Sequence, residues 1–259
     1  MANDLWQAIT LAEKEGRLHR STFPQPEPTR IYIAPDFHVP FHNNDAVIAC
    51  LDTARGADVI IQIGDANDCY GISSFDRNPA RAICLQAEAD EYQKVWLKPV
   101  RQMNPNARII QLLGNHEDRL KKTIWKNAPA LAGLRSLAWS KIWELEKYDI
   151  ELHPGTGLLI AGHRVKHGER VNKHAGGSAR MEMEDHRTNT ISGHTHRYGV
   201  ARRTDKEGYQ TTGYEIGHAC DETQVAAEYC KNPDWNLSAG ITIILHPDGR
   251  IEYIEHRLN

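Results

Sequence analysis

Short apolar runs alternate with amphipathic segments through the first half of the chain. The apolar runs are rich in isoleucine, as buried strands often are, and they lie at 30–34, 58–63 and 107–113. Helical segments are expected at about 44–55 and 80–103, and Pro99 should kink or end the second one. The first half therefore predicts strands that alternate with helices.

The second half is richer in strands. Apolar runs and turn signals predict strands at 157–161, 163–166, 188–192, 209–216 and 240–246. The chain closes with a hairpin across Asp248 and Gly249, which form a strong turn signal. Between the halves, residues 117–148 predict a helical insertion. We expect an α/β fold with two packed mixed β-sheets flanked by helices, a four-layer αββα sandwich with a helical insertion.

The N-terminal segment differs from the rest of the chain. Residues 4–16 predict a short helix, and the proline-rich stretch 23–28 predicts an extended connector. We therefore divide the chain into an N-terminal helix and connector over 1–29 and one domain over 30–259.

Composition narrows the class of protein. The chain has 259 residues, of which 40% are hydrophobic and 25% charged, values that suit one large folded domain. The formal net charge of -3 does not indicate a nucleic-acid binder, although a local basic surface is compatible with it. No apolar run reaches the roughly 18 residues of a membrane span, and a signal-peptide core is not found. Five scattered cysteines without a C-x-x-C motif fit a reduced cytoplasmic protein.

Histidine, aspartate and asparagine gather in five short motifs that follow apolar runs. In chain order these are Asp36-Phe37-His38, Gly64-Asp65-Ala66-Asn67-Asp68, Gly114-Asn115-His116-Glu117, His167-Gly168 and Gly193-His194-Thr195-His196. Carboxylates suit hard divalent ions, and imidazole suits zinc, iron and similar metals. Two metals about 3.5–4 Å apart can activate one water and stabilise an in-line phosphoryl displacement. The motifs therefore predict a two-metal hydrolytic site.

Backbone geometry suggests how this spacing works. Side chains at i and i+2 of a strand share a face, so Asp36 and His38 are expected to reach one metal together. The same holds for His194 and His196 at a strand end. A carboxylate bridges two ions more readily than a neutral imidazole does, which makes Asp65 the natural bridge.

The five motifs, in this order, resemble those of the calcineurin-like metallophosphoesterases. The resemblance extends from residue 36 to residue 196, and the strand pattern fits the family to the C-terminus. One motif alone would be a weak signal, whereas five in the right order are highly specific. The resemblance implies that residues 30–259 form a metallophosphoesterase domain.

The resemblance also implies a role for each motif residue. One metal would be held by Asp36, His38 and His196, the other by Asn115, His167 and His194, and both would be bridged by Asp65. His116 would lie near the leaving-group oxygen as a general acid or charge stabiliser. Asp68 and Glu117 would orient the ligands. The implied cofactors are two divalent metal ions, with manganese favoured and iron or zinc as alternatives.

Nine of the fourteen histidines lie outside the motifs, and a packing or surface role is the default for each. They are His19, His42, His153, His163, His174, His186, His218, His246 and His256. His163 is the rival of His167 because it lies four residues earlier on the same expected hairpin. His167 is favoured because Gly168 follows it, as in the family. His174 and His218 could approach the substrate, although the default role is favoured.

Basic residues gather beside two of the motifs. Segment 161–180 contains five basic residues against one acid, and segment 194–206 contains four against one. A basic rim around the site would favour phosphorylated, and also polymeric, substrates such as nucleic acid. A solvated surface is the alternative, and the sequence leaves both open.

Three functions follow from this pattern. The leading hypothesis is a metal-dependent phosphodiesterase, with nuclease activity as one form of it. The rival is a phosphomonoesterase, such as a protein phosphatase, because GNHEDR at 114–119 is similar to that branch of the family. Against it, the second motif has Cys69 and Tyr70 where that branch has Arg-Gly. A non-catalytic metal-binding scaffold is the third hypothesis, and the complete ligand set argues against it. A phosphorylated substrate is the expected partner, no membrane partner is expected, and the oligomeric state is left open.

Overall fold

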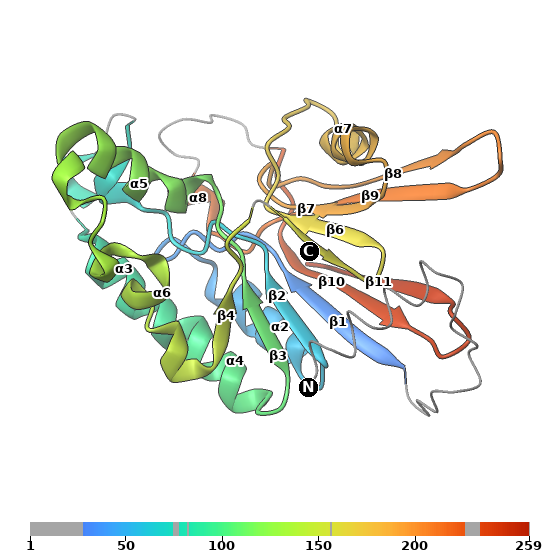
Figure 1. The fold of residues 1–259 in the computed structure, drawn as a ribbon, viewed down its shortest axis with the longest axis horizontal. Coiled ribbons are helices and arrows are strands. Elements are labelled where there is room, and N and C mark those ends of the chain that lie inside the picture. Colours follow the sequence, from blue (N-terminus) through green and yellow to red (C-terminus); the bar gives the residue numbers. More distant parts are fainter. Residues whose placement is uncertain (1–27, 75–77, 82, 156, 226–233, 259) are drawn as a thin grey trace.

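The computed structural model describes residues 28–74, 78–81, 83–155, 157–225 and 234–258, and within them the strands form two mixed sheets (Figure 1). The first sheet has the order β11-β10-β1-β2-β3-β4, with β1 (Thr29–Ala34), β2 (Val59–Gln62), β3 (Arg108–Gln111), β4 (Ile150–Leu152), β10 (Ser238–Leu245) and β11 (Ile251–Arg257). The second sheet has the order β5-β6-β7-β9-β8, with β5 (Leu158–Ile160), β6 (His163–Lys166), β7 (Asn189–Ser192), β8 (Tyr198–Thr204) and β9 (Gln210–Ile216).

Helices cover the outer faces of the two sheets. On the first sheet α2 (Asn44–Ala54) contacts β1 and β10, and on the second α7 (Gly177–His186) contacts β7, β8 and β9. Figure 1 shows α7 beside the second sheet and the other labelled helices on the side of the first. These others include α3 (Leu85–Tyr92), α4 (Lys98–Met103), α5 (Asn115–Asn127), α6 (Trp139–Ile142) and α8 (Glu222–Val225). The expected four-layer αββα sandwich is confirmed.

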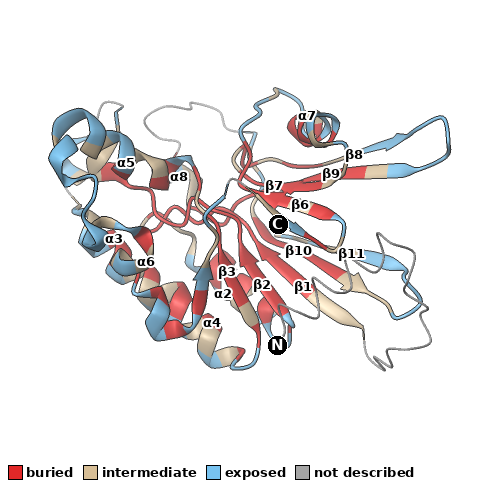
Figure 2. Ribbon diagram, viewed as in Figure 1, coloured by how far each residue is buried: buried red, intermediate tan, exposed pale blue. Residues whose placement is uncertain are grey.

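Alternating side chains of the central strands fill two separate cores. In β1, Ile31 and Ile33 pack toward the second sheet, whereas Tyr32 and Ala34 pack among the helices. Because both faces are covered, these strands are apolar along their whole length. Figure 2 shows this burial as red ribbon through β1, β2, β3 and β10.

Parallel pairing brings the sequence motifs to one edge. In the first sheet β1, β2 and β3 run parallel, and in the second β6 and β7 do. The carboxyl ends of parallel strands share an edge, where loops of open α/β sheets bind ligands. All five motifs follow the carboxyl ends of these five strands. The topology therefore places the five motif loops where a common site can form.

The expected elements agree with the structure except in five places. The predicted strands are confirmed to within two residues at each end, and the hairpin at Asp248 and Gly249 joins β10 to β11. The sequence interpretation missed β4, α7 and β8, which carry short or charged sequences. The expected insertion at 117–148 is α5 followed by short helical turns and α6, rather than one helix.

The prediction that Pro99 would kink or end a helix over 80–103 is wrong about the end, whereas the helix is irregular just before the proline. The helix begins at Leu85, and Pro99 lies inside α4, which continues to Met103. A π-helical turn at Gln93–Leu97 precedes it. A π turn changes the backbone hydrogen-bond pairing, so the missing proline N–H and the bulk of its ring are accommodated without ending the helix.

Two expectations concern residues at the N-terminus. The predicted helix at 4–16 and nearly all of the proline-rich connector lie outside the described residues, so the division at residue 29 stays a prediction. In the part of the chain that the structure describes, no helix is both long and apolar enough to cross a membrane.

Trp96 tests the core between the first sheet and its helices. It is fully buried, and its ring meets that of Phe37 edge-on with centroids 4.9 Å apart. We expect Trp96→Ala to lower the free energy of unfolding by about 3–5 kcal/mol, because it leaves a large cavity. The matched control is Trp125→Ala, since Trp125 is 60% exposed; its effect should stay within about 0.5 kcal/mol. Urea titration measures both, and equal effects would contradict this account of the core.

Candidate metal centre

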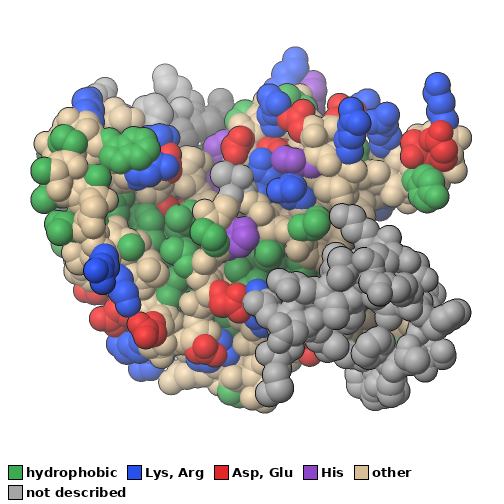
Figure 3. Space-filling view, viewed as in Figure 1, with side chains coloured by type: hydrophobic (Ala, Val, Ile, Leu, Met, Phe, Trp, Pro, Cys, Tyr) green, Lys and Arg blue, Asp and Glu red, His purple; other side chains and the backbone are tan. Residues whose placement is uncertain are grey.

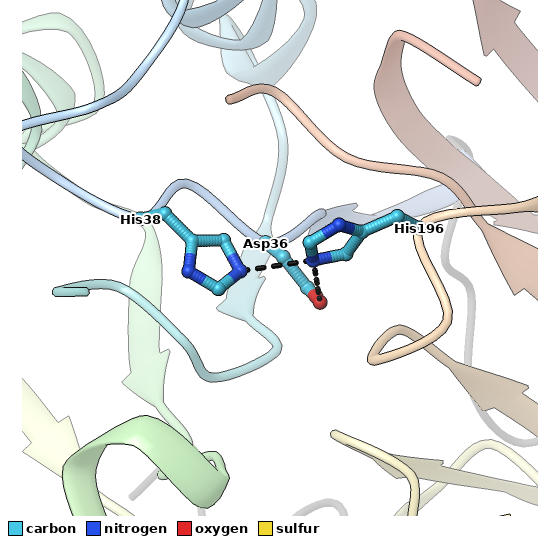
Figure 4. Close-up of side chains that lie close together, drawn as sticks. All are labelled: Asp36, His38 and His196. Atoms are coloured by element: carbon cyan, nitrogen blue, oxygen red, sulfur yellow. Dashed lines mark hydrogen bonds and ion pairs between the residues drawn. The ribbon is translucent and has the colours of Figure 1, made fainter. Parts of the chain in front are cut away.

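The first group of candidate ligands comes from the loops after β1 and β7. Asp36, His38 and His196 are buried and point toward one another (Figure 4). The Nε2 atoms of His38 and His196 lie 2.9 Å apart, and Asp36 Oδ2 lies 3.5 Å from His196 Nε2. A carboxylate and two imidazole nitrogens therefore converge on one point.

The backbone achieves this convergence in an unexpected way. The strand alternation invoked for Asp36 and His38 is wrong, because β1 ends at Ala34 and His38 has a left-handed φ of 54°. His194 and His196 also have positive φ, 71° and 60°, after the end of β7. Left-handed turns rather than a shared strand face aim these imidazoles, at a cost of about 1–3 kcal/mol per residue.

A second group comes from the loops after β2, β6 and β7. Ligand atoms of Asp65, His167 and His194 lie within 4.8 Å of one another. His167 Nε2 is 3.2 Å from Asp65 Oδ2 and 2.9 Å from Asn115 Oδ1. The structure therefore brings together all four residues that the sequence interpretation placed at this end of the site.

Asp65 lies between the two groups. Its Oδ2 is 3.2 Å from His167 Nε2 and 3.7 Å from His38 Nε2, while its Oδ1 accepts a hydrogen bond of 2.9 Å from the His116 backbone N–H. Oδ2 of Asp65 thus faces both groups of candidate ligands, and Oδ1 holds the backbone of the loop after β3. This position is the one that a bridging ligand needs, and the individual ligand roles stay predictions.

Three of the four candidate imidazole ligands have electrostatics that suit divalent metal ions. Burial, reinforced by neighbouring imidazoles, lowers the pKa of His38 and His196 and lowers the pKa of His194 to about 4. These three rings are therefore neutral and present lone pairs.

The fourth imidazole is that of His167: burial would lower its pKa, but the charges of Asp65 and Asp36 outweigh burial and raise the pKa to about 9, so this ring loses a proton when it binds a metal. Burial raises the pKa of Asp36 to about 7, and its Oδ1 has no hydrogen-bond partner among the described residues. The Nδ1 atom of His167 lies 3.8 Å from this oxygen. A buried carboxylate oxygen without a hydrogen bond, among several imidazoles, fits a cation.

His116 lies at the side of this centre. Its Nδ1 is 2.7 Å from the backbone oxygen of Asp68, so the ring donates there. Its Nε2 lies 2.9 Å from Arg119 Nη2 and 3.8 Å from Asp65 Oδ2. Burial alone would lower the pKa of His116, but the charges of Asp65 and Asp68 outweigh it and raise the pKa. The two carboxylates therefore favour a protonated ring, whereas the Arg119 guanidinium, which can only donate to Nε2, opposes it.

Glu117 and Asp68 hold the ligands in position, the roles expected of them. The Glu117 carboxylate accepts hydrogen bonds from the backbone N–H groups of Asp65, Asn67 and Gly114 at 2.9, 3.1 and 2.7 Å. Burial, with Asp65 nearby, raises the pKa of Glu117 to about 7. Asp68 Oδ1 lies 3.1 Å from His38 Nδ1, which leaves His38 Nε2 as the ligating nitrogen.

Two glycines allow the aspartates to approach the backbone closely. A Cβ at Gly114 would collide with the carboxylate of Asp65, and one at Gly193 would collide with that of Asp36. Any side chain at either position would push a candidate ligand away from the centre.

The histidines that were weighed as alternatives lie elsewhere. His163 is buried in β6, where its Nε2 contacts the Tyr253 hydroxyl at 2.6 Å. His218 packs behind His196, with ring centroids 5.1 Å apart, and its Nε2 contacts Glu222 Oε1 at 3.2 Å. His174 is exposed on the loop before α7. None of the three belongs to the groups of candidate ligands found among the described residues.

Sequence reasoning gave no role to Arg119 or Asn67. Arg119 Nη1 donates to the backbone oxygen of Asp68 at 2.7 Å, and its Nη2 lies 2.9 Å from His116 Nε2. Arg119 therefore holds both residues in place. Asn67 receives the Trp143 Nε1–H at 2.6 Å and donates to the Glu88 oxygen at 2.8 Å. Helical spacing could have indicated Arg119, which lies three residues after His116 on α5. Nothing in the sequence pattern could have paired Trp143 with Asn67, 76 residues earlier.

The two basic segments are only partly directed at the centre. Lys166 and Arg170 pair with Glu182 and Asp185 at 2.9 and 2.6 Å. Arg202 and Arg203 lie on β8, and at about 3.3 Å per residue Arg202 is roughly 13 Å along the strand from Tyr198. Figure 3 shows Lys and Arg side chains over α7 and the β8–β9 hairpin. A polyanion track along β8 therefore stays a prediction.

The chain is similar to a phage protein in sequence and to Vps29 proteins in structure. No family model matches the chain. Over 228 residues it is 23% identical to the Gene 54 protein of Mycobacterium phage L5, which covers 83% of this chain and 88% of that protein. Among solved structures it is similar to a Vps29 mutant of Entamoeba histolytica, with 13% identity, a TM-score of 0.38 and coverage of 89% of this chain and 100% of that one. Vps29 of Chaetomium thermophilum gives 10% identity, a TM-score of 0.38 and coverage of 89% and 93%. The resemblance of this chain to the calcineurin-like metallophosphoesterases therefore stands on its five ordered motifs and its αββα fold.

Metal stoichiometry tests the position of Asp65. Asp65→Asn should lose both manganese equivalents, because its Oδ2 faces both groups, whereas His38→Ala should lose one. His174→Ala, at an exposed position outside the groups, is the control and should keep two. Elemental analysis after dialysis decides the matter, and two full equivalents in the Asp65 variant would contradict a bridging role.

Removal of Glu117 should weaken both folding and metal binding. Glu117→Ala leaves three backbone N–H groups without their acceptor, so the free energy of unfolding should fall by about 3 kcal/mol or more. Manganese affinity should fall about 10–100-fold because the ligand loops lose their support. Glu146→Ala, on a side chain 87% exposed, is the control. Urea titration measures the free energy of unfolding, and calorimetry measures the manganese affinity. Wild-type values of both in the Glu117 variant would show that Glu117 does not hold the ligand loops in position.

Proposed function

We propose that the chain is a dinuclear metal-dependent phosphoesterase that hydrolyses phosphodiester bonds, with nuclease activity as the form that acts on polymers. One observation carries the proposal: Asp65 belongs to two groups of candidate ligands, one with His38 and His116 and one with His167 and His194. Asp36 and His196 converge on the same His38. The mixed nitrogen and oxygen ligands favour manganese, iron or zinc over magnesium. The four described cysteines are free thiols, which supports a reducing, cytoplasmic location.

The residues of the site would have different roles in the reaction. Bound metal ions would supply an activated water and Lewis-acid stabilisation of the phosphoryl group. Asp36, His38 and His196 would hold one ion, Asn115, His167 and His194 the other, and Asp65 both. His116 and Arg119 meet at 2.9 Å on one side of Asp65. The leaving oxygen would therefore receive either a proton from His116 or a hydrogen bond from Arg119.

A phosphomonoesterase is the second candidate, and Arg119 is the observation that favours it. A guanidinium group can grip two terminal phosphate oxygens, and Arg119 lies next to His116. However, its Nη1 and Nη2 are already engaged by the Asp68 oxygen and by His116. A diester offers fewer charged oxygens to grip, so we favour it as the substrate.

A substrate panel separates the functional classes. With added manganese, bis-p-nitrophenyl phosphate should be hydrolysed faster than p-nitrophenyl phosphate, because the site offers no dedicated terminal-phosphate clamp. Exhaustive chelation should abolish this activity and manganese should restore it. Preference for the monoester would favour a phosphatase. Inactivity on both esters and on DNA, in protein shown to contain two metal equivalents, would favour a scaffold.

His116→Asn tests the acid. The variant should keep both metals, while kcat for an alkyl phosphodiester falls by about 10²–10⁴. The fall should be smaller with p-nitrophenol as the leaving group, because that group needs little protonation. Equal losses on both substrates would instead assign His116 to charge stabilisation. Loss of metal would show that His116 is a ligand or a structural residue.

A further inference from the structure

We propose that a basic pocket on α5 binds a second phosphate group of the substrate, next to the one that is hydrolysed. The inference rests on the proposed phosphodiesterase function and adds the substrate class: diesters that carry a neighbouring phosphate. We call this cavity the α5 pocket. It lies between α5 and the chain at 71–74 and has a volume of about 270 Å³. Its polar lining includes Ser73, Ser74, Arg119, Lys122, Thr123 and Lys126.

The helix presents its cations to this pocket as a row. Arg119, Lys122 and Lys126 follow one another at spacings of three and four residues, so they share one face of α5. Thr123 on the same face hydrogen-bonds the Ile72 oxygen at 3.4 Å, which joins the two walls of the pocket. A cleft walled by one sign of charge and lined by hydroxyl groups favours an anion.

The acids near the pocket do not cancel this charge. Asp118 is shared, because Lys122 lies 2.9 Å and Lys121 2.7 Å from its two oxygens. Asp68 is buried and lies 3.8 Å from Arg119 Nη1. Among the described residues, Lys126 has no carboxylate within ion-pair distance. The α5 pocket therefore carries net positive charge that a phosphate would compensate.

Arg119 connects the α5 pocket to the metal centre. It contacts His116 Nε2 and the Asp68 oxygen on one side, and it lines the pocket on the other. Because these two hydrogen bonds engage both terminal nitrogens of Arg119, the contacts to a phosphate in the pocket would come chiefly from Lys122 and Lys126. A phosphate in the pocket would thus lie one arginine side chain away from the leaving-group side of the site.

The position of the pocket distinguishes it from the hydrolytic site itself. Its lining contains no member of the two groups of candidate ligands. A phosphate bound there would not be attacked, but it would fix a substrate whose scissile ester lies at Asp65 and His116. Oligonucleotides and 5′-phosphorylated dinucleotides have this arrangement of phosphates, whereas a simple diester does not.

Two dinucleotides differing by one phosphate test the pocket. We expect manganese-loaded wild type to have a higher kcat/KM for 5′-phosphorylated thymidylyl-thymidine than for the unphosphorylated form. In the double variant Lys122→Ala, Lys126→Ala this ratio should fall by about tenfold or more, because up to two charge-assisted contacts are lost. The control is Lys141→Ala, an exposed lysine that pairs with Glu146 and does not line the pocket. It should keep the wild-type ratio.

The outcomes separate this inference from the proposed function. An unchanged ratio in the double variant, or an equal loss in the Lys141 variant, would overturn the pocket assignment even if both dinucleotides are cleaved. If wild type cleaves neither dinucleotide, their dissociation constants from the metal-loaded protein are measured by calorimetry in place of kcat/KM. If wild type then binds the phosphorylated form more tightly and the double variant does not, the pocket is supported. That result would count only against the proposed phosphodiesterase activity. Equal dissociation constants for the two forms would overturn the pocket.

Discussion

One buried carboxylate, that of Glu117, holds the metal centre together. It accepts hydrogen bonds from the backbone of Asp65, Asn67 and Gly114, and so joins the loop after β2 to the loop after β3. The backbone oxygen of Asp65 in turn accepts hydrogen bonds from the backbone N–H groups of Phe37 and His38 at 3.1 and 2.9 Å. These hydrogen bonds join the loop after β1 to the other two loops. Three loops from three parallel strands are thereby fixed relative to one another before any ligand side chain is considered.

The second sheet is joined to this assembly through Asp36. Its Oδ2 accepts the His194 backbone N–H at 2.8 Å, and Gly193 N–H donates to the His167 oxygen at 2.8 Å. Strained residues can persist in such a setting, because the surrounding hydrogen bonds determine the backbone. Four candidate ligands, His38, Asp65, His194 and His196, have positive φ. The site is preorganised by its backbone, and the ligand side chains follow from that.

Sequence predicted the layers of the fold because the isoleucine-rich runs of β1, β2 and β3 are buried on both faces, which leaves a clear apolar signal. The sequence pattern could not predict β4 or β8, because their charged residues face solvent. It also could not predict that α4 continues past Pro99, because this depends on a local π turn. The motif residues were found because their order is specific. The left-handed turns that aim them, and the contacts of Arg119 and Trp143, depend on tertiary packing between segments distant in sequence.

The central claim is that two ions share Asp65 between two groups of ligands. Anomalous X-ray diffraction from manganese-loaded crystals tests it most directly. The account predicts two peaks per chain about 3.5–4 Å apart, with one beside Asp36, His38 and His196 and the other beside Asn115, His167 and His194. A carboxylate oxygen of Asp65 should lie between them. A single peak, or two peaks of which neither contacts Asp65, would contradict the account.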